Sequence, residues 1–280
     1  MLSRNTFITP NSSLLNKLRH VFFIKHFSKG GICINRYTPI QTNQSNKKNR
    51  QVTKTIVKAD IIVHSGIPEL DQILGGFKAG EITYVDGNSS YISQIPNQLC
   101  VNTYRTFNSN TLYLDAGVCV DPYRIAKYAQ AMEINSNDIL NHVQISRAFT
   151  VYQLSTFIYH MLEKAIQRYE PRTVVIGKFP SLYQDPDVSV TEAQIILKNN
   201  LKKLREITSK YNLITVLTNT HHRLYSNTMR QSIQSSAHET IKINDINCCT
   251  YIDILHKQTG ATIYNTKNGQ SHLDMFGVVR

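Results

Sequence analysis

Short apolar runs alternate with longer amphipathic segments through most of the chain, and this alternation restricts the possible folds more than any other feature. Runs such as Val174-Val175-Ile176 have the composition of strands that are buried on both faces. Residues 151–169 and 190–211 instead carry apolar residues every three or four positions, which is typical of helices. We therefore predict an α/β domain with a mostly parallel central sheet, flanked by helices and extended by C-terminal antiparallel strands.

The individual elements follow from the same patterns. We expect strands at residues 61–63, 82–85, 111–115, 142–145, 174–176 and 213–217, and a hairpin or two edge strands at 249–255 and 261–264. We expect helices at residues 69–74, from about Ser93, from Pro122, at 151–169 and at 190–211. The start near Ser93 follows from Pro96, because proline is tolerated in the first turn of a helix.

The basic charge of the chain is concentrated at its N-terminus. The 280 residues carry a net charge of +12, but residues 1–58 hold eleven basic and no acidic residues, which leaves twenty basic and nineteen acidic residues. We expect a basic, disordered extension at 1–58 and a core domain at 59–280. The extension is a simple tail, an arm that binds nucleic-acid phosphates, or an organellar presequence, and a wrongly assigned start codon would look the same.

The cysteine pattern and the hydropathy exclude several classes of protein. The five cysteines form no C-x-x-C pair, which favours a reducing compartment and argues against a disulfide framework or a zinc site. No run of eighteen apolar residues occurs, so no transmembrane helix is expected. We expect a cytoplasmic protein, or an organellar one if residues 1–50 are a presequence.

Residues 64–94 have the order of a phosphate-binding framework: a turn, a short helix, a glycine turn, a buried strand, and a loop entering a helix. The P-loop pattern is G-x-x-x-x-G-K-[ST]. When it begins at Gly87, its second glycine falls on Ile92, its lysine on Ser93 and its hydroxyl residue on Gln94. The loop thus keeps its position in the chain without its phosphate-binding residues.

Five segments occur in an order and at intervals that together point to one family. They are S-G-I-P-E-L-D-Q-I-L-G-G at 65–76, Y-L-D-A-G and D-P-Y-R-I at 113–125, S-R-A-F-T-V-Y-Q at 146–153, T-V-L-T-N at 215–219 and A-H at 237–238. The chain from about residue 61 to 263 resembles the RecA superfamily core, most closely the archaeal RadA-type recombinases and their paralogs. The resemblance implies a RecA-like P-loop NTPase fold, DNA-dependent ATPase ancestry, and a role in DNA recombination and repair.

The catalytic positions of that family are changed together. Gly117 stands where the family has the glutamate that activates water, and Gly177, followed by Lys178, stands at the Walker B aspartate. Because phosphoryl transfer depends on positioning and charge stabilisation, we predict a pseudo-ATPase with no catalytic residue, no metal site and no required ATP or Mg²⁺. Lys178 either supplies a cation near the former metal position or points to solvent. A weak, vestigial nucleotide site would consist of Gly87, Asn88, Ser89, Ser90, Ser93, Gln94 and Arg124.

The resemblance also identifies two loops that bind DNA in the family. The first, residues 181–188, carries Asp185 and Asp187 and no basic residue. The second, residues 220–231, is either a mobile surface loop or a single-strand binder. Its candidate DNA-binding residues are His221, His222, Arg223, Tyr225 and Arg230.

Two functions from different classes remain open. The first is a RadA-like accessory protein of recombination and repair that binds single-stranded DNA, an active RadA-type recombinase, or both. The second is a regulatory protein-interaction module, similar to KaiC-like proteins, with no nucleic-acid role. A third, an ATPase that takes a lysine from a neighbouring subunit, is weaker. No Phe-x-x-Ala tether occurs at residues 45–60, so filament formation in the family's manner is not expected. A homo- or hetero-oligomer is compatible with both functions.

Overall fold

The computed structural model describes residues 61–220 and 227–264. The strands are β1 (Ile62–Val63), β2 (Phe77–Lys78), β3 (Ile82–Gly87), β4 (Thr111–Asp115), β5 (Val143–Arg147), β6 (Thr173–Gly177), β7 (Ile214–Asn219), β8 (Glu239–Ile246), β9 (Cys249–Ile254) and β10 (Thr259–Tyr264). The helices are α2 (Pro68–Leu74), α3 (Tyr91–Phe107), α4 (Pro122–Ala131), α5 (Ser136–Asn141), α6 (Val151–Thr156), the π-helix η2 (Phe157–Met161), α7 (Leu162–Tyr169), the 3-10 helix η3 (Ser181–Gln184), α8 (Val190–Tyr211) and α9 (Asn227–Ser236).

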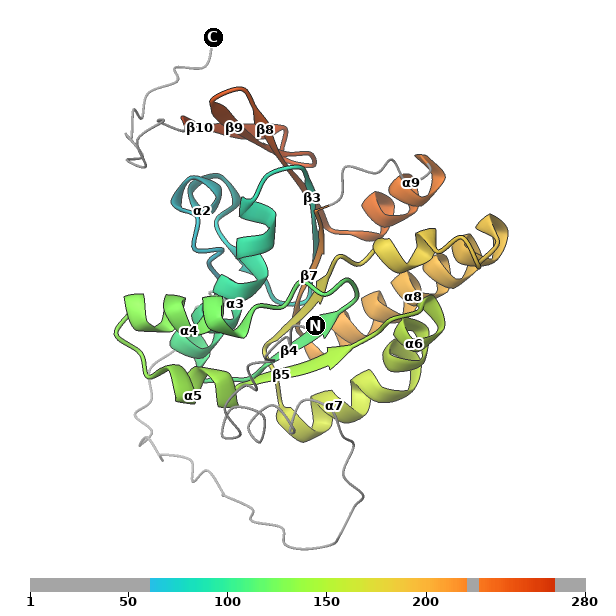
Figure 1. Cartoon of the computed structure of the whole chain (residues 1–280), viewed down its shortest axis with the longest axis horizontal. Helices are drawn as coiled ribbons and strands as arrows, with labels where there is room; N and C mark the ends of the chain where they lie inside the picture. Colours follow the sequence, from blue (N-terminus) through green and yellow to red (C-terminus); the bar gives the residue numbers. More distant parts are fainter. Residues whose placement is uncertain (1–60, 221–226, 265–280) are drawn as a thin grey trace, which may run out of the picture. The chain divides into compact units, whose positions relative to one another are not determined.

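Eight strands form one twisted sheet in the order β10-β9-β8-β3-β7-β6-β4-β5 (Figure 1). The six strands from β8 to β5 are parallel to one another. Strand β9 pairs antiparallel with β8, and β10 pairs antiparallel with β9 at the edge of the sheet. This confirms the predicted α/β architecture with C-terminal antiparallel strands. The two short strands β1 and β2 form a separate antiparallel pair.

Helices cover both faces of the sheet, as expected for strands that are apolar on both sides (Figure 1). Val174 and Ile176 of β6 pack with α6, α7 and α8, while Val175 between them packs with α3 and α4 on the other face. This alternation follows from the two-residue period of a strand, and it divides the core into two layers. The carboxyl ends of the parallel strands meet at one edge, where ligands bind in folds of this kind.

Several elements differ from the sequence prediction, and three of them lie beside the candidate site or in a long predicted helix. Helix α3 begins at Tyr91 rather than near Ser93, so Pro96 lies inside the helix. The missing hydrogen bond at Pro96 is offset by the complete burial of Ile92 and Ile95. The helix predicted at 151–169 is interrupted by the π-helical turn η2. Strand β8, which lies directly beside β3, was not predicted at all.

Candidate functional site

The turn after β3 occupies the position of a P-loop, but its backbone amides are already bonded. The N–H groups of Asn88 and Ser89 both donate to the carbonyl oxygen of Ile243 on β8, each at 3.2 Å. The N–H of Tyr91 donates to Ser89 Oγ at 3.3 Å, and the N–H of Ile92 donates to the Ser89 carbonyl at 3.2 Å. In a P-loop these groups point at the phosphates instead. Strand β8 therefore closes the turn from within the protein.

Gly87 has a structural reason for being glycine. Its φ is 145°, and a Cβ at this position would overlap the carbonyl of Ile243. Beside it, Asn88 pairs with the backbone of Asp245: its Oδ1 accepts from the Asp245 N–H at 2.6 Å, and its Nδ2 donates to the Asp245 carbonyl at 3.4 Å. These contacts attach the turn to β8.

The remaining residues of the predicted nucleotide set are engaged elsewhere. Ser93 Oγ donates to the Ser90 carbonyl at 2.8 Å, and the Ser93 N–H donates to the same oxygen at 3.2 Å. Gln94 Oε1 accepts from the Tyr128 hydroxyl at 3.3 Å. Arg124, on α4, is 3.6 Å from Asp121 and 44% exposed. The predicted residues from Gly87 to Gln94 thus share one turn, in which the N–H groups of Asn88, Ser89 and Ser93 donate to carbonyl oxygens of the protein.

The Walker B position at the end of β6 is filled by neighbouring side chains. A Cβ on Gly177 would overlap Cys119 Sγ and would lie 3.1 Å from the Tyr113 hydroxyl oxygen. Tyr113 and Cys119 contact each other at 3.6 Å between oxygen and sulfur. A carboxylate side chain at residue 177 therefore has no space in this packing.

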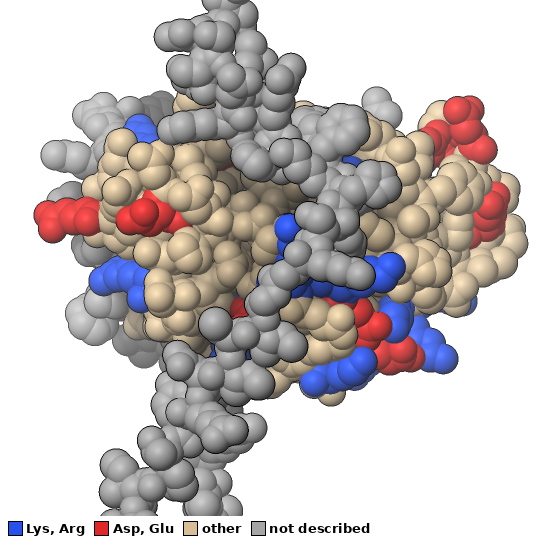
Figure 2. Space-filling view, turned by 90° about the horizontal axis from the view of Figure 1, so that it is seen from below, with Lys and Arg blue, Asp and Glu red and all other residues tan. Residues whose placement is uncertain are grey.

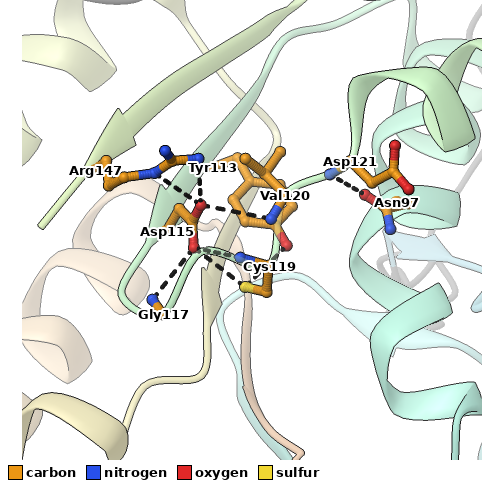
Figure 3. A network of polar contacts seen from close by, with 8 residues as sticks. All are labelled: Asn97, Tyr113, Asp115, Gly117, Cys119, Val120, Asp121 and Arg147. Atoms are coloured by element: carbon orange, nitrogen blue, oxygen red, sulfur yellow. Dashed lines mark hydrogen bonds and ion pairs between the residues drawn. The ribbon is translucent and has the colours of Figure 1, made fainter. Parts of the chain in front are cut away.

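The carboxylate of Asp115 organises the loop that supplies Cys119 (Figure 3). Asp115 is the last residue of β4 and its side chain is fully buried. It accepts hydrogen bonds from the N–H groups of Gly117 and Cys119 at 3.2 and 2.9 Å, and from Cys119 Sγ at 3.2 Å. Arg147 of β5 lies 3.0 Å from Asp115 Oδ2 through a terminal guanidinium nitrogen. Both carboxylate oxygens of Asp115 thus interact with donors of the protein.

The ionisation of this cluster follows from its surroundings. Burial opposes the charge on Asp115, but the hydrogen bonds from Cys119 and Gly117 and the Arg147 charge hold its pKa below the usual value. Burial, together with the nearby Asp115 charge, raises the pKa of Cys119 to about 12. Cys119 is therefore a thiol that donates to an ionised carboxylate, which is the pattern of a structural rather than a reactive cysteine.

The side chain of Lys178 lies against Gly117, the residue that the resemblance aligns with the family's catalytic glutamate. A Cβ on Gly117 would lie 2.6 Å from Lys178 Cδ and 2.7 Å from its Cβ. The Lys178 backbone is left-handed, with φ of 52°, and its N–H donates to Thr218 Oγ1 at 3.4 Å. The aliphatic part of the partly buried Lys178 side chain therefore lies across Gly117. It fills the space where a glutamate would need to reach.

The two candidate DNA loops differ in what the structure describes. His221, His222, Arg223 and Tyr225 lie outside the described residues, while Arg230 is a half-buried residue of α9. The first loop contains η3, whose Tyr183 is buried and accepts a hydrogen bond from Asn200 Nδ2 at 2.8 Å. Tyr183 also packs edge-on against Phe179. This aromatic residue is therefore committed to the core and is not exposed for stacking on a base.

Within residues 61–220 and 227–264, no group of three or more His, Cys, Asp or Glu side chains could hold a metal ion. Over the same ranges, no helix has both the length and the apolar character required to cross a bilayer.

The closure by β8 and the Asp115–Arg147 pair were not recognised from sequence. The alternation of Ile241, Ile243 and polar residues between them is a strand signal that would have predicted β8. The pair could not be found in this way, because Asp115 and Arg147 meet only through the parallel pairing of β4 with β5.

The order of the sheet strands and the position of the turn after β3 define a RecA-type core. A sequence model of the Rad51 family matches residues 57–242, which is more than half of the chain. The chain belongs to the Rad51 family, the group of RecA-like proteins that act in recombination and repair. The matched range ends one residue before Ile243, whose carbonyl closes the turn.

Proposed function

We propose that this protein is a recombination and repair accessory member of the Rad51 family that does not hydrolyse ATP. It acts by binding single-stranded DNA, an active recombinase, or both. The first part of the proposal, that the protein does not hydrolyse ATP, is supported mainly by one observation. The amides that a P-loop directs at phosphate are bonded to Ile243 and Ser89. Four replaced catalytic positions and two filled spaces are consistent with it.

The residues at this turn do not fit a magnesium-bound triphosphate. Binding one would require breaking the bonds from Asn88 and Ser89 to β8 before any phosphate contact forms. Ser93 and Gln94 would replace the lysine and the metal-ligating hydroxyl, and Gly177 carries no carboxylate. The charge stabilisation that phosphoryl transfer needs has no source in these residues.

Steady-state hydrolysis of ATP tests the first part of the proposal. The full-length protein with Mg²⁺ and single-stranded DNA should release no phosphate above a buffer blank, and the Ser93→Lys variant should be equally inactive. The variant matters because a lysine alone leaves the amides of the turn bonded. Turnover that disappears in a Gly87 or Arg124 variant would overturn the proposal.

The core domain has too little net positive charge to attract DNA through its overall electrostatic field. The chain outside residues 1–58 holds twenty basic and nineteen acidic residues. Figure 2 shows basic and acidic side chains next to each other at one end of the face viewed from below, with uncharged residues over much of the rest. Any affinity for DNA therefore comes from the N-terminal segment or from local basic surfaces.

Electrophoretic mobility of labelled single-stranded DNA tests the second part. The full-length protein and residues 60–280 should both shift the DNA at moderate salt, with the full-length protein binding more tightly. If neither shifts DNA and no recombinase is captured, the accessory function fails. The regulatory interaction module would then be favoured, and the near-neutral core and the acidic, packed first loop support that alternative.

A further inference from the structure

A hollow of about 300 Å³ lies between α8 and α9, away from the turn after β3. The two helices lie next to each other on one side of the sheet (Figure 1). The hollow is bounded by three basic residues and Leu201 from α8 and by three serines from α9. Its lining residues are Lys198, Leu201, Lys202, Arg205, Ser232, Ser235 and Ser236.

The basic residues of the hollow share one face of α8. Lys198, Lys202 and Arg205 are separated by four and three positions, the spacing that places helical residues in one row. All three are exposed. Within the described residues, none of the three forms an ion pair with an acidic side chain.

A second basic pair on the same helix is arranged differently. Lys203 and Lys210 lie 3.7 and 3.1 Å from the carboxylate oxygens of Glu163 on α7. The single carboxylate of Glu163 therefore offsets part of the positive charge of this pair. The same helix thus presents one basic face that is paired and one that faces the hollow.

The opposite wall adds no negative charge. Helix α9 contains no acidic residue, and its serines are small enough to keep the hollow open. Ser232 and Ser235 donate to carbonyls of their own helix, at 2.9 and 3.2 Å. Glu206 follows Arg205 on α8 but does not line the hollow. The side chains that face an incoming anion are therefore three cations and small hydroxyl residues.

We infer that the α8–α9 hollow is a binding surface for consecutive phosphates of single-stranded DNA. Lys198, Lys202 and Arg205 form one row about 10 Å long along the helix axis, so an extended phosphate backbone that lies along α8 can contact them in succession. The inference rests on the proposed DNA-binding function and names a surface for it.

A pair of matched full-length variants tests the inference. Lys198→Gln/Lys202→Gln removes two charges from the hollow, and Lys203→Gln/Lys210→Gln removes two from the paired face of the same helix. Each is titrated against a fluorescein-labelled 20-nucleotide oligothymidine by anisotropy at several salt concentrations. Circular dichroism melting checks that all three proteins are folded. Inorganic pyrophosphate and polyglutamate serve as competitors that carry anionic charge without a nucleic-acid backbone.

The hollow variant should bind about tenfold more weakly, and the slope of log K against log salt should become shallower by about 1.4, or 0.7 for each lost phosphate contact. The control should bind within about twofold of the unaltered protein. Equal affinities for all three proteins would overturn the inference but leave the proposed function intact. Absence of binding by the unaltered protein would overturn both. Displacement of the oligonucleotide by pyrophosphate or polyglutamate at low concentration would show that the hollow binds anions in general and not a nucleic-acid strand. This result would overturn the inference but not the proposed function.

Discussion

Gly177 illustrates how a single residue decides whether the ancestral site could be rebuilt. In a family with a carboxylate at this position, an aspartate would seem a simple restoration. Here Cys119 Sγ and the Tyr113 hydroxyl occupy the space beside its Cα, and Asp115 holds Cys119 in place. The site therefore differs from one with a carboxylate at residue 177 in its packing as well as in its residue types.

We predict that Gly177→Asp destabilises the fold without producing ATPase activity. The new side chain would displace Cys119 and bring an unpaired charge into the core, which should lower the free energy of unfolding by about 3 kcal/mol or more. Urea denaturation measures the change. Ser93→Lys is the control, because this half-exposed position should change stability by less than about 0.5 kcal/mol. An unchanged unfolding free energy for Gly177→Asp would contradict the packing described for Cys119.

The ionised Asp115 makes stability depend on acid pH. Its pKa is lower in the folded than in the unfolded state, so its contribution is present above about pH 4 and is lost as the pH falls through the folded pKa. Asp115→Asn should lower the unfolding free energy at pH 7 by about 2 kcal/mol, and the difference should shrink between pH 4 and pH 2. Denaturation across pH, with the exposed Asp187→Asn as control, measures it. A constant difference at every pH would argue that Asp115 is not ionised.

At the scale of elements, β8 has the largest effect on the candidate site. It pairs with β3 along five residues and places the Ile243 carbonyl against Gly87. Its first residues are joined to β3 by His238, whose N–H donates to the Ile82 carbonyl and whose Nδ1 accepts from the Ile82 N–H. The turn and the junction at the other end of β3 are thus both controlled by one neighbouring strand.

The close approach of β8 to β3 predicts different costs for two glycines with positive φ. Gly87→Ala should destabilise by about 3 kcal/mol or more, because the added methyl group overlaps the Ile243 carbonyl. Gly75→Ala, at φ of 79° but with nothing within 4 Å, should cost only the backbone strain of about 1 kcal/mol. Equal losses in thermal or chemical denaturation would indicate that β8 does not close the turn.

The His238 junction predicts a second pH effect, in the neutral to mildly acidic range. Burial, then the Arg205 charge, lowers the pKa of His238, while Glu81 opposes the shift and His256 adds to it. As the pH falls below about 6.5, the unfolded chain takes up a proton first, so stability decreases until the lower folded pKa is passed. His238→Asn keeps an acceptor for the Ile82 N–H and cannot titrate. The variant should lose less stability than the unaltered protein between pH 7 and pH 5, measured by urea denaturation, and identical pH profiles would contradict this role.

For the whole molecule, the proposed loss of nucleotide binding has a direct thermal consequence. A ligand at 100 times its Kd stabilises the folded state by about 2.7 kcal/mol, which would raise Tm by roughly 5–10 °C in a core of this size. We predict that 1 mM ATP with Mg²⁺ shifts Tm by less than about 1 °C. Differential scanning fluorimetry with ADP and Mg²⁺ alone as controls measures the shift. A nucleotide-specific increase that requires Arg124 would reverse the proposal.

The repeating strand and helix patterns made the fold predictable, because each depends on a few neighbouring residues and on burial on one or both faces. Residues 190–211 were predicted as one helix and form α8 with those bounds. The start of α3 was wrong by two residues, because the burial of Ile92 and Ile95 outweighs the preference of Pro96 for a first turn. The replaced residues of the P-loop pattern could also be recognised from the sequence, because a motif is defined by residue type and spacing.

The closing of the turn after β3 is a tertiary property. Gly87 and Ile243 are far apart in the chain, as are Gly177 and Cys119, and no local pattern states that a carbonyl or a sulfur atom will lie beside them. The residue types alone did not decide whether the backbone amides of this turn bind phosphate weakly. The pairing of β3 with β8 decides where the amides of Asn88 and Ser89 donate, because a hydrogen-bond donor used by a neighbouring strand is no longer available to a ligand.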